Sequence, residues 1–263
     1  MTENPLIVDV AADGRATVTL NRPDVHNAFD DNLIAILTKE LDALDRNPAV
    51  GAVVLAAAGR SFSAGADLKW MQRMAEDSEA ENRADAEAMA ALMKTLNGLS
   101  KPTVARVQGA AYGGGIGLIC CCDIAIASEA AVFSISEVKL GLIPAVISPY
   151  VVGAIGERQA RRYALSAERF AAEEAKRIGL VHEVTAAGDL QAAVDGMAGA
   201  LLANGPAAMA EAKDQIAGVA NRPADDRLIA DTAARIARIR VSDEGREGVA
   251  AFLEKRKPGW TRK

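Results

Sequence analysis

The sequence predicts an α/β fold whose layered core is followed by a helical C-terminal region. Up to about residue 195, short apolar segments with the composition of strands alternate with segments of helical character. Short apolar strands of this kind are typical of a mostly parallel sheet that helices cover on both faces. From about Asp189 onward, long Ala-rich segments broken by Gly205-Pro206 favour helices. We therefore expect a core over residues 1–195 and a helical region over residues 196–263.

The first elements are a hairpin, an amphipathic helix and a buried strand. Two apolar segments flank the turn signal Asp13-Gly14, which predicts a hairpin formed by Leu6–Val10 and Ala16–Leu20. Pro48 follows a helix that is predicted by the spacing of Leu33, Ile34, Leu37, Leu41 and Leu44. The apolar segment Ala52–Ala56 then predicts a short buried strand, after which a Gly-rich turn follows.

The alternation of helix and strand continues through the middle of the chain. The composition of Asp85–Leu96 indicates a helix, and Pro102 opens an apolar strand that runs to Val107. A glycine cluster at residues 113–117 leads into an apolar helix over Ile116–Cys122. Asp123–Ala127 then alternates as a further strand.

Composition excludes several classes of function. Half of the 263 residues are hydrophobic and a quarter are charged, as in ordinary globular proteins. The net charge of −5 argues against a nucleic-acid-binding surface as the main function. The N-terminus does not resemble a secretory signal, and no apolar run approaches the roughly 20 residues that a membrane span needs. We therefore expect a cytoplasmic protein that does not contact a membrane.

Cysteine and histidine do not form a recognisable reactive site in the sequence. Cys120, Cys121 and Cys122 are adjacent and have no partner elsewhere, so we expect them to be reduced, buried side chains. No His/Cys pair has the spacing of metal ligands, so we expect no metal. His182 lies in an apolar stretch and is expected to be structural, whereas His26 is expected on a surface loop.

The most informative features are the glycine cluster and the carboxylate of Glu137, 20 residues after Gly117. Glycines at a strand-to-helix junction let a substrate approach the backbone closely. Free N–H groups at a helix start attract developing negative charge. A second turn, residues 63–67, offers a further donor. Together these features predict an oxyanion site with a proton-transfer group beside it.

Other interpretations of the glycine cluster fail on the residues themselves. A dinucleotide fingerprint requires a glycine at position 118 or 120, where the chain has Leu118 and Cys120. Neither a P-loop sequence nor a G-x-S-x-G nucleophile elbow occurs. Because the histidines have other expected roles, general acid–base chemistry is assigned to a carboxylate.

Two interpretations of Glu137 stay open on composition alone. The side chain caps or solvates the start of a short helix, or it is a functional acid. Its apolar neighbours, such as Ile135 and Val138, favour partial burial. Burial would raise the pKa of the carboxyl group and help it hold or deliver a proton near neutrality.

A set of short motifs extends from about residue 15 to about residue 260. The motifs are Asn21-Arg22-Pro23, Asn27-Ala28-Phe29, Phe62 to Leu68, Gln108 to Gly115, Cys122 to Ala125, Glu137 to Pro144 and Ala251 to Arg256. Each motif is weak by itself, but their order and spacing together resemble the enoyl-CoA hydratase/isomerase (crotonase) family.

The resemblance implies a spiral of repeated β-β-α turns, a helical C-terminal trimerisation region and a coenzyme A thioester substrate. It also implies that the backbone N–H groups of Ala66 and Gly114 form a hole for the thioester oxygen, with Glu137 as the catalytic acid/base. Fixed donors stabilise the enolate-like oxyanion that develops in such reactions. The resemblance implies a homotrimer or a hexamer of two trimers, and it implies no metal or redox cofactor.

The resemblance extends to residues that contact the substrate. They are Ala64, Asp67, Leu68 and Lys69 for the acyl-CoA, Val25, Asn27 and Ala28 for the pantetheine and adenine groups, and Phe252 and Lys255 for the nucleotide end of CoA. For the last two, a core position for Phe252 and a solvated charge at Lys255 are equally open.

Gly117 departs from the pattern of the two-carboxylate hydratases, which have a glutamate two residues after the triple glycine. Since glycine cannot orient water, we expect Glu137 to carry the proton alone and Gly117 to leave space for water or a substrate carboxylate. The loop Ala145–Tyr150 also differs from that of many hydratases, so we expect an altered acyl pocket.

Three functions are consistent with these residues. The run Leu142–Tyr150 is similar to that of bacterial family members assigned to 3-methylglutaconyl-CoA hydration. The first hypothesis is therefore reversible addition of water to a short or branched 2-enoyl-CoA. The second is an enoyl-CoA isomerase, which needs one acid/base only. The third is a non-catalytic acyl-CoA-binding protein.

Overall fold

The computed structural model describes residues 4–261, so the outermost residues of the two predicted regions, 1–3 and 262–263, lie outside it. Its strands are β1 (Leu6–Val10), β2 (Arg15–Leu20), β3 (Ala52–Ala57), β4 (Ser61–Ser63), β5 (Thr103–Val107), β6 (Ala110–Tyr112), β7 (Ile124–Ser128), β8 (Val132–Ser134), β9 (Phe170–Ala171) and β10 (Glu183–Thr185). They form one sheet of order β1-β2-β3-β5-β7-β10 and another of order β4-β6-β8-β9. β1 is antiparallel to β2 and β9 to β8, whereas the other neighbouring pairs are parallel.

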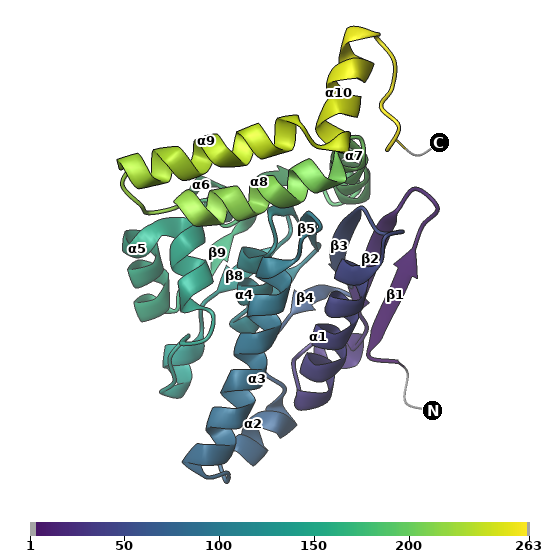
Figure 1. The fold of residues 1–263 in the computed structure, drawn as a ribbon. Coiled ribbons are helices and arrows are strands. Elements are labelled where there is room, and N and C mark those ends of the chain that lie inside the picture. Colours follow the sequence, from purple (N-terminus) through teal and green to yellow (C-terminus); the bar gives the residue numbers. More distant parts are fainter. Residues whose placement is uncertain (1–3, 262–263) are drawn as a thin grey trace.

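Helices surround these sheets (Figure 1). They are α1 (Asp31–Arg46), α2 (Leu68–Met74), α3 (Glu79–Gly98), α4 (Gly114–Cys121), α5 (Ser148–Ser166), α6 (Ala172–Arg177), α7 (Leu190–Leu202), α8 (Pro206–Val219), α9 (Asp226–Arg240) and α10 (Asp243–Leu253), with the short 3-10 helices η1 (Pro23–Val25) and η2 (Glu137–Leu140). Within residues 4–261, none of the helices is long and apolar enough to cross a membrane. The predicted α/β class is confirmed.

The chain winds as a spiral of β-β-α units. β3 and β4 precede α2 and α3, β5 and β6 precede α4, and β7 and β8 precede η2 and α5. In each unit the first strand joins the six-stranded sheet and the second strand joins the four-stranded sheet. This is the repeated β-β-α turn that the resemblance implies.

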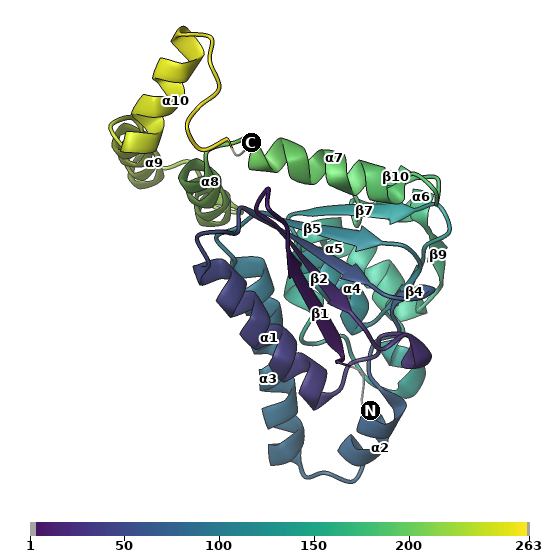
Figure 2. The same ribbon diagram turned by 90° about the vertical axis from the view of Figure 1, so that its right-hand side faces the viewer.

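Both faces of the six-stranded sheet are covered, as the apolar strands predict. On one face, α7 packs Leu190, Val194 and Ala198 against side chains of β3, β5 and β7 (Figure 2). The larger core lies on the other face, where α1, α3 and α4 cover the sheet. All six residues of β3 are buried, because helices enclose this strand on both sides.

The two long helices on that face begin at side-chain caps. Asp30 accepts a hydrogen bond from the N–H of Leu33 at 2.8 Å, and the apolar stripe of α1 is buried as predicted. Ser78 and Glu81 form a capping box at the start of α3. α3 therefore begins six residues before the predicted Asp85, because this cap precedes the first apolar residues of the helix.

The predicted boundary between residues 195 and 196 falls inside α7, which belongs to the core because it packs on the sheet. The helical appendage therefore begins at α8. α8 and α9 lie side by side and α10 projects beyond them (Figures 1 and 2). Within these three helices only Leu228 and Ala251 are buried. Lys213 of α8 links the appendage to the core through an ion pair of 2.7 Å with Asp123.

The three cysteines lie at the end of α4. All three thiols are free, and Cys121 and Cys122 are buried as expected, whereas Cys120 is half-buried. Loss of hydration raises the pKa of the Cys120 thiol to about 12, so it stays protonated at neutral pH.

Candidate active site

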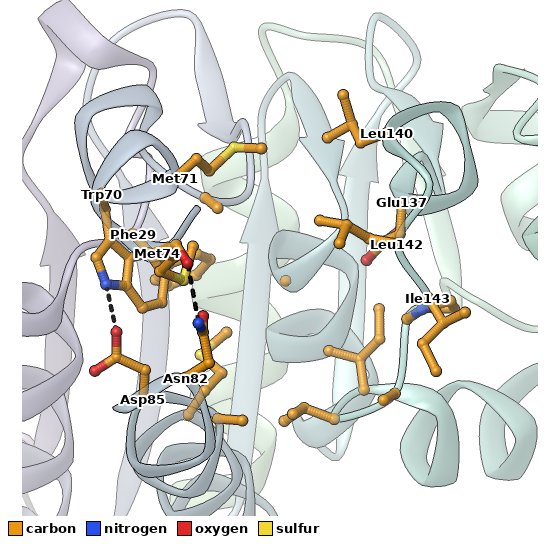
Figure 3. A pocket seen from close by; sticks show the side chains of 18 of the residues that line it. Phe29, Trp70, Met71, Met74, Asn82, Asp85, Glu137, Leu140, Leu142 and Ile143 are labelled. Atoms are coloured by element: carbon orange, nitrogen blue, oxygen red, sulfur yellow. Dashed lines mark hydrogen bonds between the residues drawn. The ribbon is translucent and has the colours of Figure 1, made fainter. Parts of the chain in front are cut away.

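A cavity of about 660 Å³ opens between α2 and α3 on one side and the segment after β8 on the other (Figure 3). This volume is within the range of pockets that enclose small-molecule ligands. Most of its lining is apolar, with Trp70, Met71, Met74 and Met89 facing Leu140, Leu142, Ile143 and Ile147. Among the described residues that line it, the ionisable ones are Asp85 and Glu137, and none is cationic.

The structure brings together the three residues predicted as the chemical centre. Ala66 from the loop before α2, Gly114 from the start of α4 and Glu137 from the start of η2 all line this cavity. Three residues that are distant in sequence therefore line the same cavity.

Backbone pairing sets the direction of the Ala66 amide. The N–H of Phe29 donates to the carbonyl of Gly65 at 2.7 Å, and the N–H of Asp67 donates to the carbonyl of Phe29 at 2.8 Å. In such a parallel bridge the residues on either side of Ala66 make the bonds, so its own N–H points away from Phe29. Among the described residues, none accepts a hydrogen bond from this N–H.

Gly114 is the first residue of α4, where a helix leaves its N–H groups without intrahelical acceptors. Gly113 before it has a φ of +50°, a conformation that favours glycine. A Cβ at Gly113 would lie 3.1 Å from Oε1 of Glu137. Glycine at position 113 therefore permits both the turn into α4 and the close approach of the carboxyl group.

Glu137 is half-buried, and its carboxyl group is turned toward the cavity (Figure 3). Its Oε2 atom is buried and has no hydrogen-bond partner among the described residues. Burial raises the pKa of Glu137, although hydrogen bonds from the backbone N–H groups of Glu137 and Ser136 oppose the change. A buried oxygen left unpaired costs stability, which is typical of a group kept for chemistry. These contacts favour the functional interpretation over the helix-capping one.

Gly117 lies one turn further along α4. The expectation that it leaves space for water or a substrate carboxylate is wrong, because a neighbouring side chain fills that space. A Cβ at Gly117 would lie 2.3 Å from Cγ2 of Ile147 and 3.0 Å from Cε of Met93. The side chain of Ile147, which lines the cavity, therefore fills the space that a larger residue at position 117 would occupy. That space does not hold water or a substrate carboxylate in this structure.

The other predicted contacts divide into exposed and buried residues. Val25, Ala64, Leu68 and Lys69 are exposed, whereas Asn27, Ala28 and Asp67 are buried, and none of the seven lines the cavity. Asn27 donates from Nδ2 to the carbonyls of Ala58 at 2.8 Å and Ser61 at 2.9 Å. Its Oδ1 accepts from the N–H of Arg22. Asn27 thus holds the loop rather than presenting its amide to a ligand.

Arg22 does not line the cavity but supports the loop beside it, a role that the sequence did not reveal although Arg22 lies in one of the motifs. Its Nη2 lies 2.9 Å from carboxylate oxygens of both Asp30 and Asp67, and its Nη1 donates to the carbonyl of Ala28. Asp67 also accepts from the N–H of Lys69 and so begins α2. Burial raises the pKa of Asp67, but the Lys69 N–H and the Arg22 charge outweigh it and hold the pKa below its ordinary value. This clamp fixes the turn that carries Ala66.

Phe252 and Lys255 lie at the end of the helical appendage. Phe252 is 81% exposed, so it is not a core residue. α10 and α2 lie at opposite ends of the molecule (Figure 1). Neither Phe252 nor Lys255 lines the cavity of its own chain.

Both histidines have hydrogen-bonding partners in the fold, but His26, expected on the surface, is half-buried, and His182 is exposed. The N–H of Ala125 donates to Nδ1 of His182 at 3.0 Å, and the N–H of His182 donates to the Ala125 carbonyl at 2.8 Å. His26 lies in a loop with Nδ1 at 3.0 Å from Oγ of Ser61. Within residues 4–261, no group of three or more His, Cys, Asp or Glu side chains is arranged to hold a metal ion.

Trp70 and Asp85 also form part of the cavity wall and were not predicted as site residues. Nε1 of Trp70 donates to Oδ2 of Asp85 at 3.0 Å, which joins α2 to α3 (Figure 3). A second link is the hydrogen bond from Nδ2 of Asn82 to the Met74 carbonyl at 2.9 Å. The sequence signal was slight: Trp70 is one of two tryptophans in the chain.

The spiral fold and a mainly apolar cavity lined by a half-buried glutamate are those of an α/β enzyme. The sequence model of the enoyl-CoA hydratase/isomerase family matches residues 11–263, and the chain belongs to this family.

Individual relatives agree with this assignment. The crystal structure of an enoyl-CoA hydratase from Shewanella pealeana superimposes with a TM-score of 0.95 at 47% identity, covering 98% of this chain and 97% of that one. An enoyl-CoA hydratase of Mycobacterium tuberculosis is 34% identical over 245 residues, or 92% of this chain and 91% of its own. A hydroxycinnamoyl-CoA hydratase-lyase of Pseudomonas fluorescens is 33% identical over 204 residues, or 76% of this chain and 74% of its own.

Proposed function

We propose that this protein adds water reversibly to a short or branched 2-enoyl-CoA thioester. The observation that carries the proposal is the unpaired Oε2 of Glu137, a residue that lines the same cavity as Ala66 and Gly114. In the proposed complex the N–H groups of Ala66 and Gly114 bind the thioester oxygen. The exposed Leu68 and Lys69 at the start of α2 contact the CoA portion.

Glu137 carries the proton in the proposed reaction. Its carboxylate takes a proton from water as the water oxygen bonds to the β-carbon and the thioester becomes an enolate. The same carboxyl group then delivers the proton to the α-carbon on the same face of the substrate. The two amides stabilise the enolate oxygen, and the loss of one such donor costs roughly 3–4 kcal/mol of transition-state stabilisation in comparable sites. The raised pKa of Glu137 suits both steps.

The charge of the cavity lining limits which acyl group the cavity can accept. 3-Methylglutaconyl-CoA carries a second carboxylate, and the described lining offers no cationic side chain to pair with it. Burying an unpaired carboxylate beside Asp85 and Glu137 is unfavourable. Within the proposal, an uncharged branched or short acyl group is therefore a better substrate than 3-methylglutaconyl-CoA.

An enoyl-CoA isomerase is the second candidate, and one observation favours it. Ile147 fills the space beside Gly117, so no second acid lies there to orient water. An isomerase needs only to remove a proton from one carbon and return it to another. Glu137 and the two amides suffice for this reaction.

An assay with purified protein separates these functions. Straight and 3-methyl-branched 2-enoyl-CoAs, 3-methylglutaconyl-CoA and a 3-enoyl-CoA are incubated with the protein, and products are identified by mass spectrometry. We expect a product heavier by one water from the uncharged 2-enoyl-CoAs. Isomer without any hydrated product would replace the hydratase by the isomerase. Binding of acyl-CoA without turnover of any substrate would support the non-catalytic function instead.

Replacing Glu137 by glutamine tests its role. Glu137→Gln keeps the shape of the side chain but cannot accept a proton, so kcat is expected to fall by about 10²–10⁴-fold. The affinity for a saturated acyl-CoA, measured by calorimetry, is expected to change little. An equal loss of binding and turnover would indicate a structural role for Glu137.

We also propose that the protein assembles as a homotrimer, or as two trimers, through the helical appendage. Its support is the number of large apolar side chains that α8, α9 and α10 leave exposed: Ile216, Ile229, Ile236, Val249, Phe252 and Leu253. Exposed apolar surface of this extent is typical of an interaction site.

A further inference from the structure

A second cavity adjoins the active-site cavity. It has a volume of about 400 Å³ and lies between α1 and α3. Trp70 and Asp85 line both cavities. These two side chains therefore form a partition between the acyl cavity and the groove along α1 and α3.

Contacts on both sides hold the partition in place. Trp70 is only 7% exposed, and its indole N–H donates to Oδ2 of Asp85 at 3.0 Å. The indole projects from α2 and the carboxylate from α3, so their hydrogen bond spans the gap between the two helices (Figure 3). The hydrogen bond fixes the rotation of the ring, because turning the indole would leave its N–H unpaired.

The groove on the far side has a suitable surface for an apolar chain. Its lining includes Ile34 and Ala35 of α1 and Ala88 and Ala91 of α3. The groove is also lined by five charged side chains, which are Asp31, Lys39, Asp42, Arg46 and Asp85. An acyl chain that passed Trp70 would meet apolar side chains of both helices.

We propose that Trp70, held by Asp85, sets the upper limit on the length of the acyl group, and that the groove between α1 and α3 is the closed-off continuation of the acyl cavity. The inference rests on the proposed function only in that the ligand is an acyl-CoA, and it is independent of which reaction follows. Trp70 acts here as a specificity-determining residue.

Binding of saturated acyl-CoAs tests the partition without requiring turnover. Dissociation constants are measured by calorimetry for a series from butyryl-CoA to dodecanoyl-CoA, with the wild-type protein and with Trp70→Ala. We expect wild-type affinity to stop rising at a defined chain length and Trp70→Ala to move this limit to longer chains. Beyond the wild-type limit, each methylene that enters the groove is expected to tighten binding about fourfold, the equivalent of about 0.8 kcal/mol per CH₂.

Matched variants separate the partition from a simple gain in volume. Met71→Ala enlarges the acyl cavity without opening the groove, because Met71 lines the first cavity and not the second, so the length limit is expected to stay. Trp70→Phe retains a smaller ring but loses the N–H that donates to Asp85, so it is expected to move the limit less than Trp70→Ala does. Asp85→Ala frees the indole and is expected to improve binding of the longer chains. Because Asp85→Ala leaves the Trp70 side chain in the core, this variant can test the partition even if Trp70→Ala fails to fold.

The outcomes distinguish this inference from the proposed function. An unchanged length limit in folded Trp70→Ala, or an equal shift in Met71→Ala, would overturn the partition. If Trp70→Ala does not fold, unchanged binding of long chains by Asp85→Ala would do the same. A shifted limit in a protein that turns over no enoyl-CoA would uphold the partition and reject the proposed reaction.

Discussion

Glu137 has a buried, unpaired carboxyl oxygen, and its carboxyl group lies close to the start of α4. Its Oε2 is buried without a partner among the described residues, and its Oε1 would lie only 3.1 Å from a Cβ at residue 113 in the α4 turn. The first property destabilises the folded state, because a buried polar atom loses its bonds to water. The second orients the carboxyl group into the cavity. Sites that sacrifice stability in this way are typical of catalytic groups.

Because the carboxyl group of Glu137 is buried, the free energy of unfolding is expected to depend on pH. The pKa of Glu137 is raised in the folded state, so the folded protein holds the proton more strongly than the unfolded chain does. Its contribution therefore becomes unfavourable as the pH rises from the ordinary glutamate pKa through the raised one. Since Glu137→Gln does not ionise, this variant is expected to be more stable than the wild type at neutral pH.

Urea unfolding over a pH series measures this effect. The advantage of Glu137→Gln should disappear as the pH falls below the ordinary glutamate pKa. Glu129→Gln makes the same substitution at an exposed position outside the cavity and serves as the control. A variant less stable than the wild type at neutral pH would contradict the expected burial cost.

At the residue scale, the sequence indicated three residues that line one cavity, but it did not indicate the side chains around them. Ala66, Gly114 and Glu137 were predicted through motifs whose spacing is specific in combination. Ile147 was missed because the space beside a glycine can be filled by a side chain 30 residues away in the sequence. The pairing of Trp70 with Asp85 depends on how two helices meet, which no local pattern indicates.

At the element scale, the loop that carries Ala66 has no regular structure of its own and depends on a network of side chains. Arg22 joins Asp30 at the start of α1 to Asp67 at the start of α2. The two carboxylates and the guanidinium group are mostly shielded from water. One arginine therefore positions two helix starts and the amide between them.

Removing this arginine is expected to affect catalysis through position rather than contact. Arg22→Ala leaves Asp67 buried without its cation, so a loss of about 2–3 kcal/mol in the free energy of unfolding is expected. As the turn loosens, kcat should fall more than the affinity for acyl-CoA. Arg22→Lys restores a charge but not the paired geometry and should recover part of kcat.

An exposed ion pair provides the control for this prediction. Arg73 pairs with Asp31 at 3.1 Å, and both side chains are more than half exposed. Arg73→Ala is expected to change the stability by less than about 1 kcal/mol. If Arg22→Ala and Arg73→Ala behave alike in unfolding and in kcat, the clamp has no special role.

Helices and strands with a regular apolar pattern were predicted, whereas the shortest strands were missed. α1, β3, β5 and β7 were predicted because each carries a periodic or continuous apolar pattern. β4, β6 and β8 have three residues each, too few to show an alternation. The predicted boundary divides α7 between the core and the appendage, because the composition of α7 resembles that of the appendage. Its buried face nevertheless packs on the sheet.

At the scale of the whole molecule, a core with two covered sheets contrasts with an appendage that buries almost nothing. We expect the protein to sediment as a trimer or hexamer at micromolar concentration. Ile229→Asp, in the apolar surface of α9, should shift the distribution toward monomer. Ile7→Asp places the same change at an exposed isoleucine of β1, outside the appendage, and should leave assembly unchanged. A monomeric wild type would contradict the proposed assembly.

The spiral winding has a consequence for how the chain reaches this structure. Parallel pairing of β3 with β5 joins residues 50 positions apart, such as Val53 and Thr103, and β2 with β3 pairs Arg15 with Ala52. Each pairing must close a long loop before its contacts form, which is typical of slow folding. Because every turn adds a strand to both sheets, neither sheet can be completed ahead of the other. The two sheets are therefore expected to form in one cooperative step, with unpaired strand edges exposed until the last turn is in place.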